Sequence, residues 1–291
     1  MRNLPTRDRL IQRARLYGGR TVRSLLRAPL GHKCVFLHMP KCGGTSVAEG
    51  LYATVPLEDR IGVLSSQAIR RGISFLHLGR EDAAAFHDEG AQAEAMARFR
   101  EQLVLMHMAQ DAALIHGHFL LTDPIRAMAR ARGYRFVTIL RDPVARTISN
   151  FRMARRNSVF AGDFDAFLDS AMGRRMAQHG LRFLAGQATI APGAEAQALA
   201  AAKRNLAEFE VVGFLDDLDG FAQAFASGFG NRPRFAHYNR APDAVFRLSP
   251  AQRDRLTALC APDIALTEWA RTRTAQLATA APIPQAGGQP T

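Results

Sequence analysis

Four short apolar runs with strand-like composition are spaced along the chain. They cover residues 34–38, 112–116, 136–140 and 211–215, and each one is followed by a helix-start signal or by a helical pattern. Continuous apolar runs are typical of strands that are buried on both faces, and strands that alternate with helices favour a parallel sheet. The pattern therefore predicts a three-layer α/β fold, in which helices cover both faces of a mostly parallel sheet.

Helical spacing of apolar residues accounts for much of the remaining chain. Residues 65–109 are rich in Ala, Arg and Met and are expected to form a helical insertion, and residues 163–185 and 194–209 are further helical stretches. Near the end of the chain, Ser249 precedes a proline, and Gln252 follows three residues later. This arrangement is a capping box, so it predicts the start of a C-terminal helix.

Composition divides the chain into three regions. Residues 1–30 contain eight arginines interleaved with leucine, isoleucine and valine, so they form a basic and roughly amphipathic segment. Such a segment is either a solvated or flexible extension or one that touches a membrane surface or an acidic polymer. Residues 31–278 are expected to form the globular domain. Residues 279–291 have too few packing side chains for a core and are expected to be a disordered tail.

The charge balance indicates anionic partners. The 291 residues include 38 Lys and Arg against 26 Asp and Glu, a net charge of +12, which favours nucleotides, acidic polymers or a membrane surface. No run of apolar residues is long enough to span a bilayer, so we expect a soluble protein. The three cysteines, Cys34, Cys42 and Cys260, have neither the number nor the spacing of a disulfide framework or a zinc site. They favour a reducing, cytoplasmic setting, which includes the inner face of the membrane if residues 1–30 bind there.

The turn after the first apolar run has the composition of an anion-binding loop. Its candidate residues are Pro40, Lys41, Cys42, Gly43, Gly44, Thr45 and Ser46. A strand that stops at a proline and re-enters a helix leaves backbone N–H groups aimed outward, and glycines allow an anion to approach them closely. The lysine precedes the glycines, so the loop is not the G-x-x-x-x-G-K-[ST] phosphate loop. An ordinary glycine-rich turn with a solvated lysine is the alternative.

A second candidate anion site follows the third apolar run. Arg141 stands at the carboxyl end of the predicted strand, Asp142 can cap the next helix, and Pro143 suits its first turn. Ser149 lies about two turns into that helix. The guanidinium fork of Arg141 could bind a phosphate through two parallel hydrogen bonds. The alternative is a structural pair between Arg141 and Asp142 at a helix start.

Two histidines lie between these sites. His116 and His118 flank Gly117 at the end of the second apolar run, and strand alternation places them on the same side if the strand continues that far. Gly117 would let another chain or a ligand approach closely. Histidine is the side chain whose ordinary pKa suits a general base near neutral pH, although a single histidine at a strand end is often structural.

Together these motifs resemble the sulfotransferases that use 3′-phosphoadenosine 5′-phosphosulfate (PAPS). In that family P-K-x-G-[GS]-T-S between a strand and a helix holds the phosphosulfate, and R-D-P-x-x-R-x-x-S binds the 3′-phosphate. Here the two patterns run from Pro40 to Ser46 and from Arg141 to Ser149, in the same order. The His-Gly-His sequence is closest to the branch that sulfates uronic acids at the 2-O position in heparan and dermatan sulfate. The likeness covers residues 33–270 and indicates a bacterial member.

The resemblance implies a P-loop-like sulfotransferase fold and a reaction. In it His118 is the base, His116 is a supporting residue, and Lys41 stabilises the leaving adenosine 3′,5′-bisphosphate (PAP). PAPS is the donor, no metal takes part, and the acceptor is a hydroxyl of an anionic or neutral glycan. Asn239 and Arg240 fall where relatives have a basic loop that closes over the nucleotide, although a solvated surface loop is equally compatible.

Cys42 departs from the family pattern, because many relatives have threonine at this position. Beside Lys41 at a helix N-terminus its thiol could be acidic and prone to oxidation, or it could be a passive replacement. Two other functions also remain open. One is an atypical nucleotide-dependent kinase, which would need a magnesium-binding carboxylate. The other is a non-enzymatic module that binds anions or nucleic acid, although no nucleic-acid recognition element is present.

Overall fold

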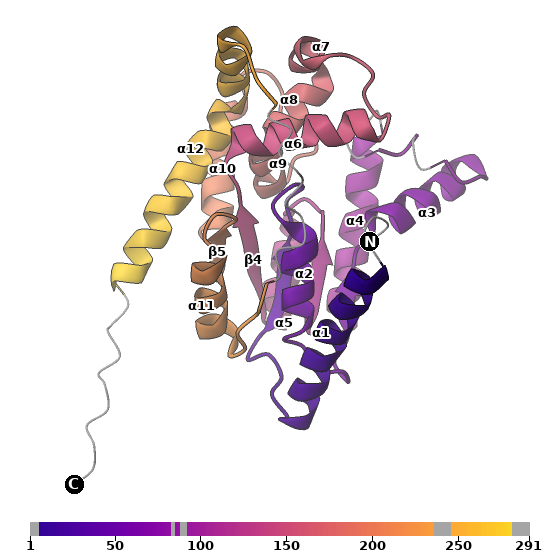
Figure 1. The fold of residues 1–291 in the computed structure, drawn as a ribbon, viewed down its shortest axis with the longest axis vertical. Helices are drawn as coiled ribbons and strands as arrows, with labels where there is room; N and C mark the ends of the chain where they lie inside the picture. Colours follow the sequence, from indigo (N-terminus) through magenta and orange to yellow (C-terminus); the bar gives the residue numbers. More distant parts are fainter. Residues whose placement is uncertain (1–5, 83–84, 88–91, 236–245, 281–291) are drawn as a thin grey trace.

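The central sheet has five strands in the computed structural model, which describes residues 6–82, 85–87, 92–235 and 246–280 (Figure 1). The strands are β1 (Lys33–Leu37), β2 (Ile61–Val63), β3 (Leu114–Gly117), β4 (Tyr134–Leu140) and β5 (Val211–Phe214). Their order is β2-β3-β1-β4-β5, and every neighbouring pair is parallel. The predicted parallel α/β architecture is therefore confirmed, and the four predicted strands correspond to β1, β3, β4 and β5.

The edge strand β2 was not predicted. It has only three residues, of which Gly62 is buried, while Val63 is 47% exposed. Three residues are too few to show an apolar run or an alternation of apolar and polar positions. The strand forms because it pairs with β3, not because its own side chains are buried.

Twelve helices in the described part of the chain surround the sheet. They are α1 (Thr6–Leu25), α2 (Gly44–Tyr52), α3 (Ser66–Leu78), α4 (Ala93–Ala109), α5 (Asp123–Arg132), α6 (Pro143–Arg156), α7 (Phe164–Asp169), α8 (Ala171–Ala177), α9 (His179–Ala185), α10 (Glu195–Leu206), α11 (Leu218–Phe229) and α12 (Pro250–Ala280). The predicted insertion comprises α3 and α4. The stretch expected at residues 163–185 is divided into α7, α8 and α9.

The chain path creates a crevice beyond the carboxyl end of β1. From β1 the chain crosses through α2 to the far edge strand β2, whereas the connections through α4 and α5 run back toward β4. Right-handed crossovers therefore place α2 on one face and α4 with α5 on the other, and Figure 1 shows α2 in front of the sheet. Ligands of open α/β sheets bind at such a reversal, so this crevice is the expected place for a site.

The C-terminal helix begins as the sequence predicts. The backbone N–H of Gln252 donates to Oγ of Ser249 at 3.2 Å, and Oε1 of Gln252 accepts from the backbone N–H of Ser249 at 3.1 Å. The helix continues through Pro262 to Ala280, which places the predicted boundary at residue 278 in its last turn. No helix in the described residues combines the length and the apolar character that crossing a membrane requires.

Candidate functional site

The loop between β1 and α2 has an unusual backbone. Lys41 and Gly43 both adopt left-handed conformations, with φ of 65° and 73°. Gly43 occupies the N-cap position of α2, and no side chain caps this helix. A lysine rarely adopts positive φ unless its surroundings hold it there. Here the Nη1 of Arg141 donates to the carbonyl of Lys41 at 2.9 Å, so the second motif supports the conformation of the first.

Gly44 is required by a neighbouring histidine ring. A Cβ at Gly44 would lie 1.7 Å from Cε1 of His38, which follows β1 directly. The missing side chain therefore makes room for an imidazole, whereas the sequence suggested that it makes room for an anion. Gly117 behaves similarly, because a Cβ there would lie 2.4 Å from Cβ of Leu64. In both cases the close approach is made by the protein itself.

Four cations gather at the end of the loop. Lys41 is half-buried, and its Nζ lies 3.9 Å from Sδ of Met153 on α6. Burial lowers the pKa of Lys41, and the positive charges of Arg156, Arg141 and Arg152 lower it further. None of the four has a carboxylate partner among the described residues. Positive charges that crowd together without counter-ions, beside an uncapped helix N-terminus, form an electrostatic site for an anion.

The start of α6 confirms the local prediction for the second motif. Oδ1 of Asp142 accepts from the backbone N–H of Ala145 at 2.7 Å, and Pro143 is the first residue of the helix. Asp142 therefore caps the helix instead of pairing with Arg141. Ser149 is half-buried and stands one helical turn before Met153, so it shares the helix face that approaches Lys41.

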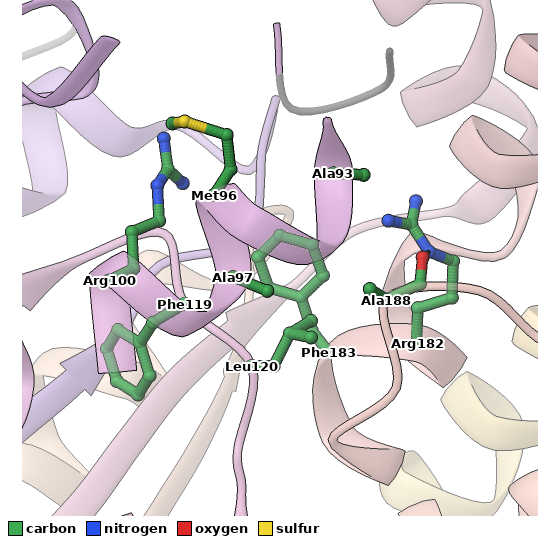
Figure 2. Close-up of a pocket in the computed structure, with 9 residues that line it drawn as sticks. All are labelled: Ala93, Met96, Ala97, Arg100, Phe119, Leu120, Arg182, Phe183 and Ala188. Atoms are coloured by element: carbon green, nitrogen blue, oxygen red, sulfur yellow. Dashed lines mark hydrogen bonds between the residues drawn. The ribbon is translucent and has the colours of Figure 1, made fainter. Parts of the chain in front are cut away.

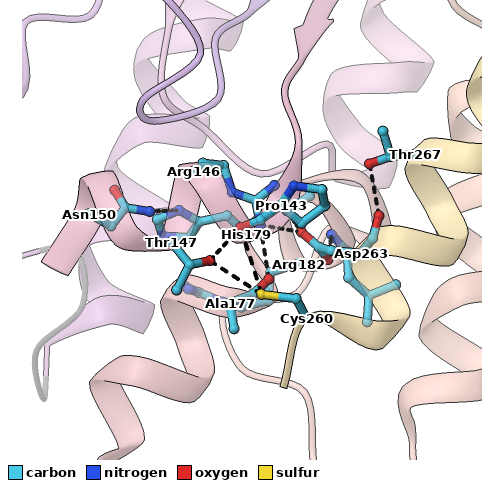
Figure 3. A network of polar contacts seen from close by, with 12 residues as sticks. Pro143, Arg146, Thr147, Asn150, Ala177, His179, Arg182, Cys260, Asp263 and Thr267 are labelled. Atoms are coloured by element: carbon cyan, nitrogen blue, oxygen red, sulfur yellow. Dashed lines mark hydrogen bonds and ion pairs between the residues drawn. The ribbon is translucent and has the colours of Figure 1, made fainter. Parts of the chain in front are cut away.

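Arg146, the second arginine of this motif, faces the interior instead. It is 2% exposed, and its Nη2 donates to Oδ2 of Asp263 on α12 at 2.6 Å and to the carbonyl of Ala177 at 2.9 Å. The same carboxylate accepts from the backbone N–H groups of Gly180 and Leu181 at 2.7 and 2.9 Å. Figure 3 shows this network between α6, α9 and α12. Arg146 is therefore a structural residue, although it belongs to the phosphate-binding pattern.

Cys42 has no exposed surface and belongs to the main core. Burial raises the pKa of its thiol to about 11, and this outweighs the opposite effect of Arg146. The thiol is therefore protonated and inaccessible, so the idea of an acidic, oxidation-prone cysteine is wrong. Its backbone N–H donates to the carbonyl of Met39 at 3.3 Å, which removes it from the donors that could face an anion.

Three histidines stack beside the cation cluster. His116 on β3 contacts His38 through Nε2 and Nδ1 at 3.2 Å, and the Nδ1 of His116 lies 2.7 Å from the hydroxyl of Tyr52. Burial lowers the pKa of His116 to about 3. Burial also lowers the pKa of His38, and His118, His116 and Lys41 add to the effect. His38 and His116 are therefore neutral at physiological pH, and the effect of Lys41 on the pKa of His38 indicates that its charge lies near the histidine group.

His118 is fixed by two neighbours. Its Nδ1 lies 2.5 Å from the carbonyl oxygen of His38, and because a carbonyl only accepts, this nitrogen carries the proton. In the neutral ring Nε2 is then the basic nitrogen. From the insertion, Nη1 of Arg100 donates to the backbone carbonyl of His118 at 2.7 Å, and its Nη2 donates to Oγ of Ser66 at 3.1 Å. The helical insertion therefore helps to position the candidate base.

Arg100 also lines a small cavity behind His118. The cavity has a volume of about 30 Å³, and Figure 2 shows Arg100 and Arg182 on either side of its apolar lining. This volume fits about one water molecule and no sugar, so the acceptor cannot bind there. A larger cavity of about 580 Å³ opens between α1 and α2, next to Ser46.

The structure thus connects Lys41, Arg141, His116 and His118: Arg141 holds the carbonyl of Lys41, and His38 contacts both histidines and lies within the influence of the charge of Lys41. Pro40 is half-buried on the loop, and Thr45 and the half-buried Ser46 are the second and third residues of α2. Asn239 and Arg240 lie outside the described residues. The sequence did not single out His38, Tyr52, Arg152 or Arg156. The position of His38 directly before the loop was the available signal for the first of them.

No protein-family model matches the sequence, and no curated protein matches it. Among solved structures, the chain is similar to the crystal structure of a sulfotransferase from Alicyclobacillus acidocaldarius. The two chains are 19% identical, the match covers 81% of this chain and 94% of the other, and the TM-score is 0.43. At this level of similarity, a function has to rest on the residues of the site itself.

Proposed function

We propose that the protein is a PAPS-dependent sulfotransferase that transfers a sulfuryl group to a hydroxyl of a glycan. The observation that carries this proposal is that His38 links His118 to the cation cluster: its carbonyl holds Nδ1 of His118, and the charge of Lys41 acts on its ring. Lys41 is crowded by three arginines, and none of these four cations has a carboxylate partner among the described residues. A group-transfer enzyme of this kind needs a base next to a site for an anionic leaving group. An ordinary glycine-rich turn with a solvated lysine would leave Lys41 exposed, whereas it is half-buried among arginines.

In the proposed reaction the residues act on the two ends of the transferred group. Nε2 of His118 removes the proton from the acceptor hydroxyl, whose oxygen attacks sulfur in line with the departing phosphate oxygen. Lys41 and the first N–H groups of α2 stabilise the charge that develops on that oxygen, so they bind the transition state more tightly than the ground state. Arg141 and Ser149 hold the 3′-phosphate, and Asn239 and Arg240 are the proposed residues of a closing loop.

His116 supports the base in this scheme. It is neutral and contacts both Tyr52 and His38, so it helps to hold His38, whose backbone carbonyl binds Nδ1 of His118. The His-Gly-His sequence also supports an acceptor of the uronic acid type, sulfated at the 2-O position. The surplus of arginine suits such an anionic glycan.

Ligand-dependent stabilisation of the whole chain tests the donor assignment. We expect PAP to raise the melting temperature more than ATP, AMP or duplex DNA at equal concentration, because only PAP has both phosphates in the required positions. Stronger stabilisation by ATP with magnesium would favour the kinase alternative. Stronger stabilisation by DNA would favour a nucleic-acid-binding module.

Arg141→Ala should chiefly weaken donor binding. Loss of a bidentate hydrogen-bonded contact to a phosphate is expected to reduce the binding free energy by about 2 kcal/mol. This corresponds to roughly a thirtyfold increase in the Kd of PAP. Isothermal titration measures this change directly. The matched control is Arg174→Ala on α8, an exposed arginine outside the crevice, which should bind PAP as the wild type does. An unchanged Kd for Arg141→Ala would exclude this residue from the 3′-phosphate site.

A further inference from the structure

One side of α1 exposes large apolar side chains to solvent. The exposed fractions are 62% for Leu10, 40% for Ile11, 55% for Tyr17, 50% for Val22 and 78% for Leu25. At 100° per residue these five side chains fall within one sector of about 140° of the helix, and Ala14 and Gly18 lie between them. Thr21 is the polar residue in this sector among those whose side chains the structure describes, and the sector is wide, in contrast to the scattered exposed leucines of ordinary surfaces.

The opposite side of α1 is firmly attached to the domain. Arg20 donates from Nη2 to the carbonyls of Pro56 at 2.7 Å and Asp59 at 2.8 Å, and its Nε donates to the carbonyl of Val55 at 3.1 Å. Gly19 packs so closely on Ala53 that a Cβ would lie 2.8 Å from the Cβ of that alanine. The apolar side is therefore held outward as a preformed surface, and binding through it requires no further ordering of the helix.

Arginines border this apolar side. Arg13 and Arg15 are exposed on α1, and Arg15 and Arg23 line the large cavity beside α2. Two further arginines, Arg232 and Arg234, are exposed and line the same cavity. An apolar strip flanked by arginines has the charge and shape of helices that lie in the interface of an anionic bilayer.

We propose that α1 is a membrane-surface helix, which inserts its apolar side into a bilayer of anionic lipids while its arginines contact the headgroups. Charge complementarity decides between occupants. A second copy of the chain would bring a second molecule of net charge +12 and a second set of the arginines beside α1, whereas an anionic lipid surface neutralises these charges. Attachment in this orientation would hold the crevice at a fixed distance from the lipid surface.

Vesicle sedimentation of the full chain tests this proposal. The wild type should sediment with vesicles of phosphatidylcholine and phosphatidylglycerol at low salt, and much less with pure phosphatidylcholine. The double variant Leu10→Glu with Leu25→Glu should bind the anionic vesicles at least about tenfold more weakly. It removes two leucines that would be buried in the bilayer, and it adds two negative charges next to an anionic surface. Both positions are exposed, so the melting temperature should not change.

The control variant carries two apolar-to-glutamate substitutions on other helices. Met106→Glu with Leu277→Glu replaces residues that are 42% and 56% exposed on α4 and α12, and it should bind the vesicles as the wild type does. If both double variants lost vesicle binding equally, overall charge alone would explain the binding, and the proposal would be overturned. Absence of wild-type binding, or a wild-type dimer that the Leu10 and Leu25 variant converts to a monomer, would also overturn it.

Discussion

Replacement of His118 by alanine should lower turnover by about 10²–10⁴-fold, the range that a positioned general base contributes. The binding of PAP should be unchanged, because the nearest donor contacts come from Lys41 and α6. The melting temperature should also be close to that of the wild type, since the ring is half-buried. Transfer from labelled PAPS to a panel of glycans measures the turnover, and calorimetric titration measures the binding.

The pH dependence separates a base from a supporting residue. The wild type should lose kcat/KM on the acid side, where the base becomes protonated, and His118→Ala should lack this limb. His116→Ala should keep the decrease of kcat/KM on the acid side and should lose less turnover than His118→Ala. Burial already holds the pKa of His116 near 3 and keeps this histidine neutral, so it cannot be the group that titrates. Near-normal turnover of His118→Ala on the true acceptor would rule this histidine out as the base.

Removal of the buried guanidinium in Arg146→Ala should lower the free energy of unfolding by about 3–5 kcal/mol, because it leaves the Asp263 carboxylate buried without a countercharge. Both partners are 2% exposed or less. Burial alone would lower the pKa of Arg146, but Asp263 keeps it raised, so the guanidinium is charged in the native protein. Urea denaturation gives the free energy, and tryptophan fluorescence or circular dichroism follows the transition.

An exposed ion pair provides the matched control. Arg255 is 41% exposed, and it pairs with two carboxylates, Asp165 at 2.7 Å and Asp169 at 2.5 Å. Arg255→Ala should cost less than about 1 kcal/mol, because water screens the pair and solvates the carboxylates that remain. If the two variants lost similar stability, burial would not be the source of the effect at Arg146.

The fold could be predicted as far as its signals are local. Buried runs and helix caps, such as Asp142 and the box of Ser249 and Gln252, depend on neighbouring residues, and the structure confirms them. The strand β2 depends on its partner β3, and its three residues have no pattern of their own. Pairing between distant segments was therefore the part of the fold that the sequence could not show.

The same limit applies to the site. Lys41, Arg141 and His118 follow strand ends, where position alone suggests chemistry, and the structure connects them through the carbonyl of Lys41 and through His38. Arg152 and Arg156 reach the loop only because α6 packs along it, which no spacing in the sequence reveals. Cys42 and Arg146 were assigned to the loop and the phosphate pattern by their place in the motif. In the structure Cys42 lies in the main core, and Arg146 pairs with Asp263 in the interior.

The separation between Arg146 and Asp263 also restricts the order in which the protein can form. The partners are 117 residues apart, and the carboxylate joins α6, α9 and α12. While a ribosome is making the segments after α6, Arg146 has no counter-ion, so α6 cannot bury this side without a large penalty. The helix that carries the second motif therefore acquires its final place, beside the first loop, only after α12 has been synthesised.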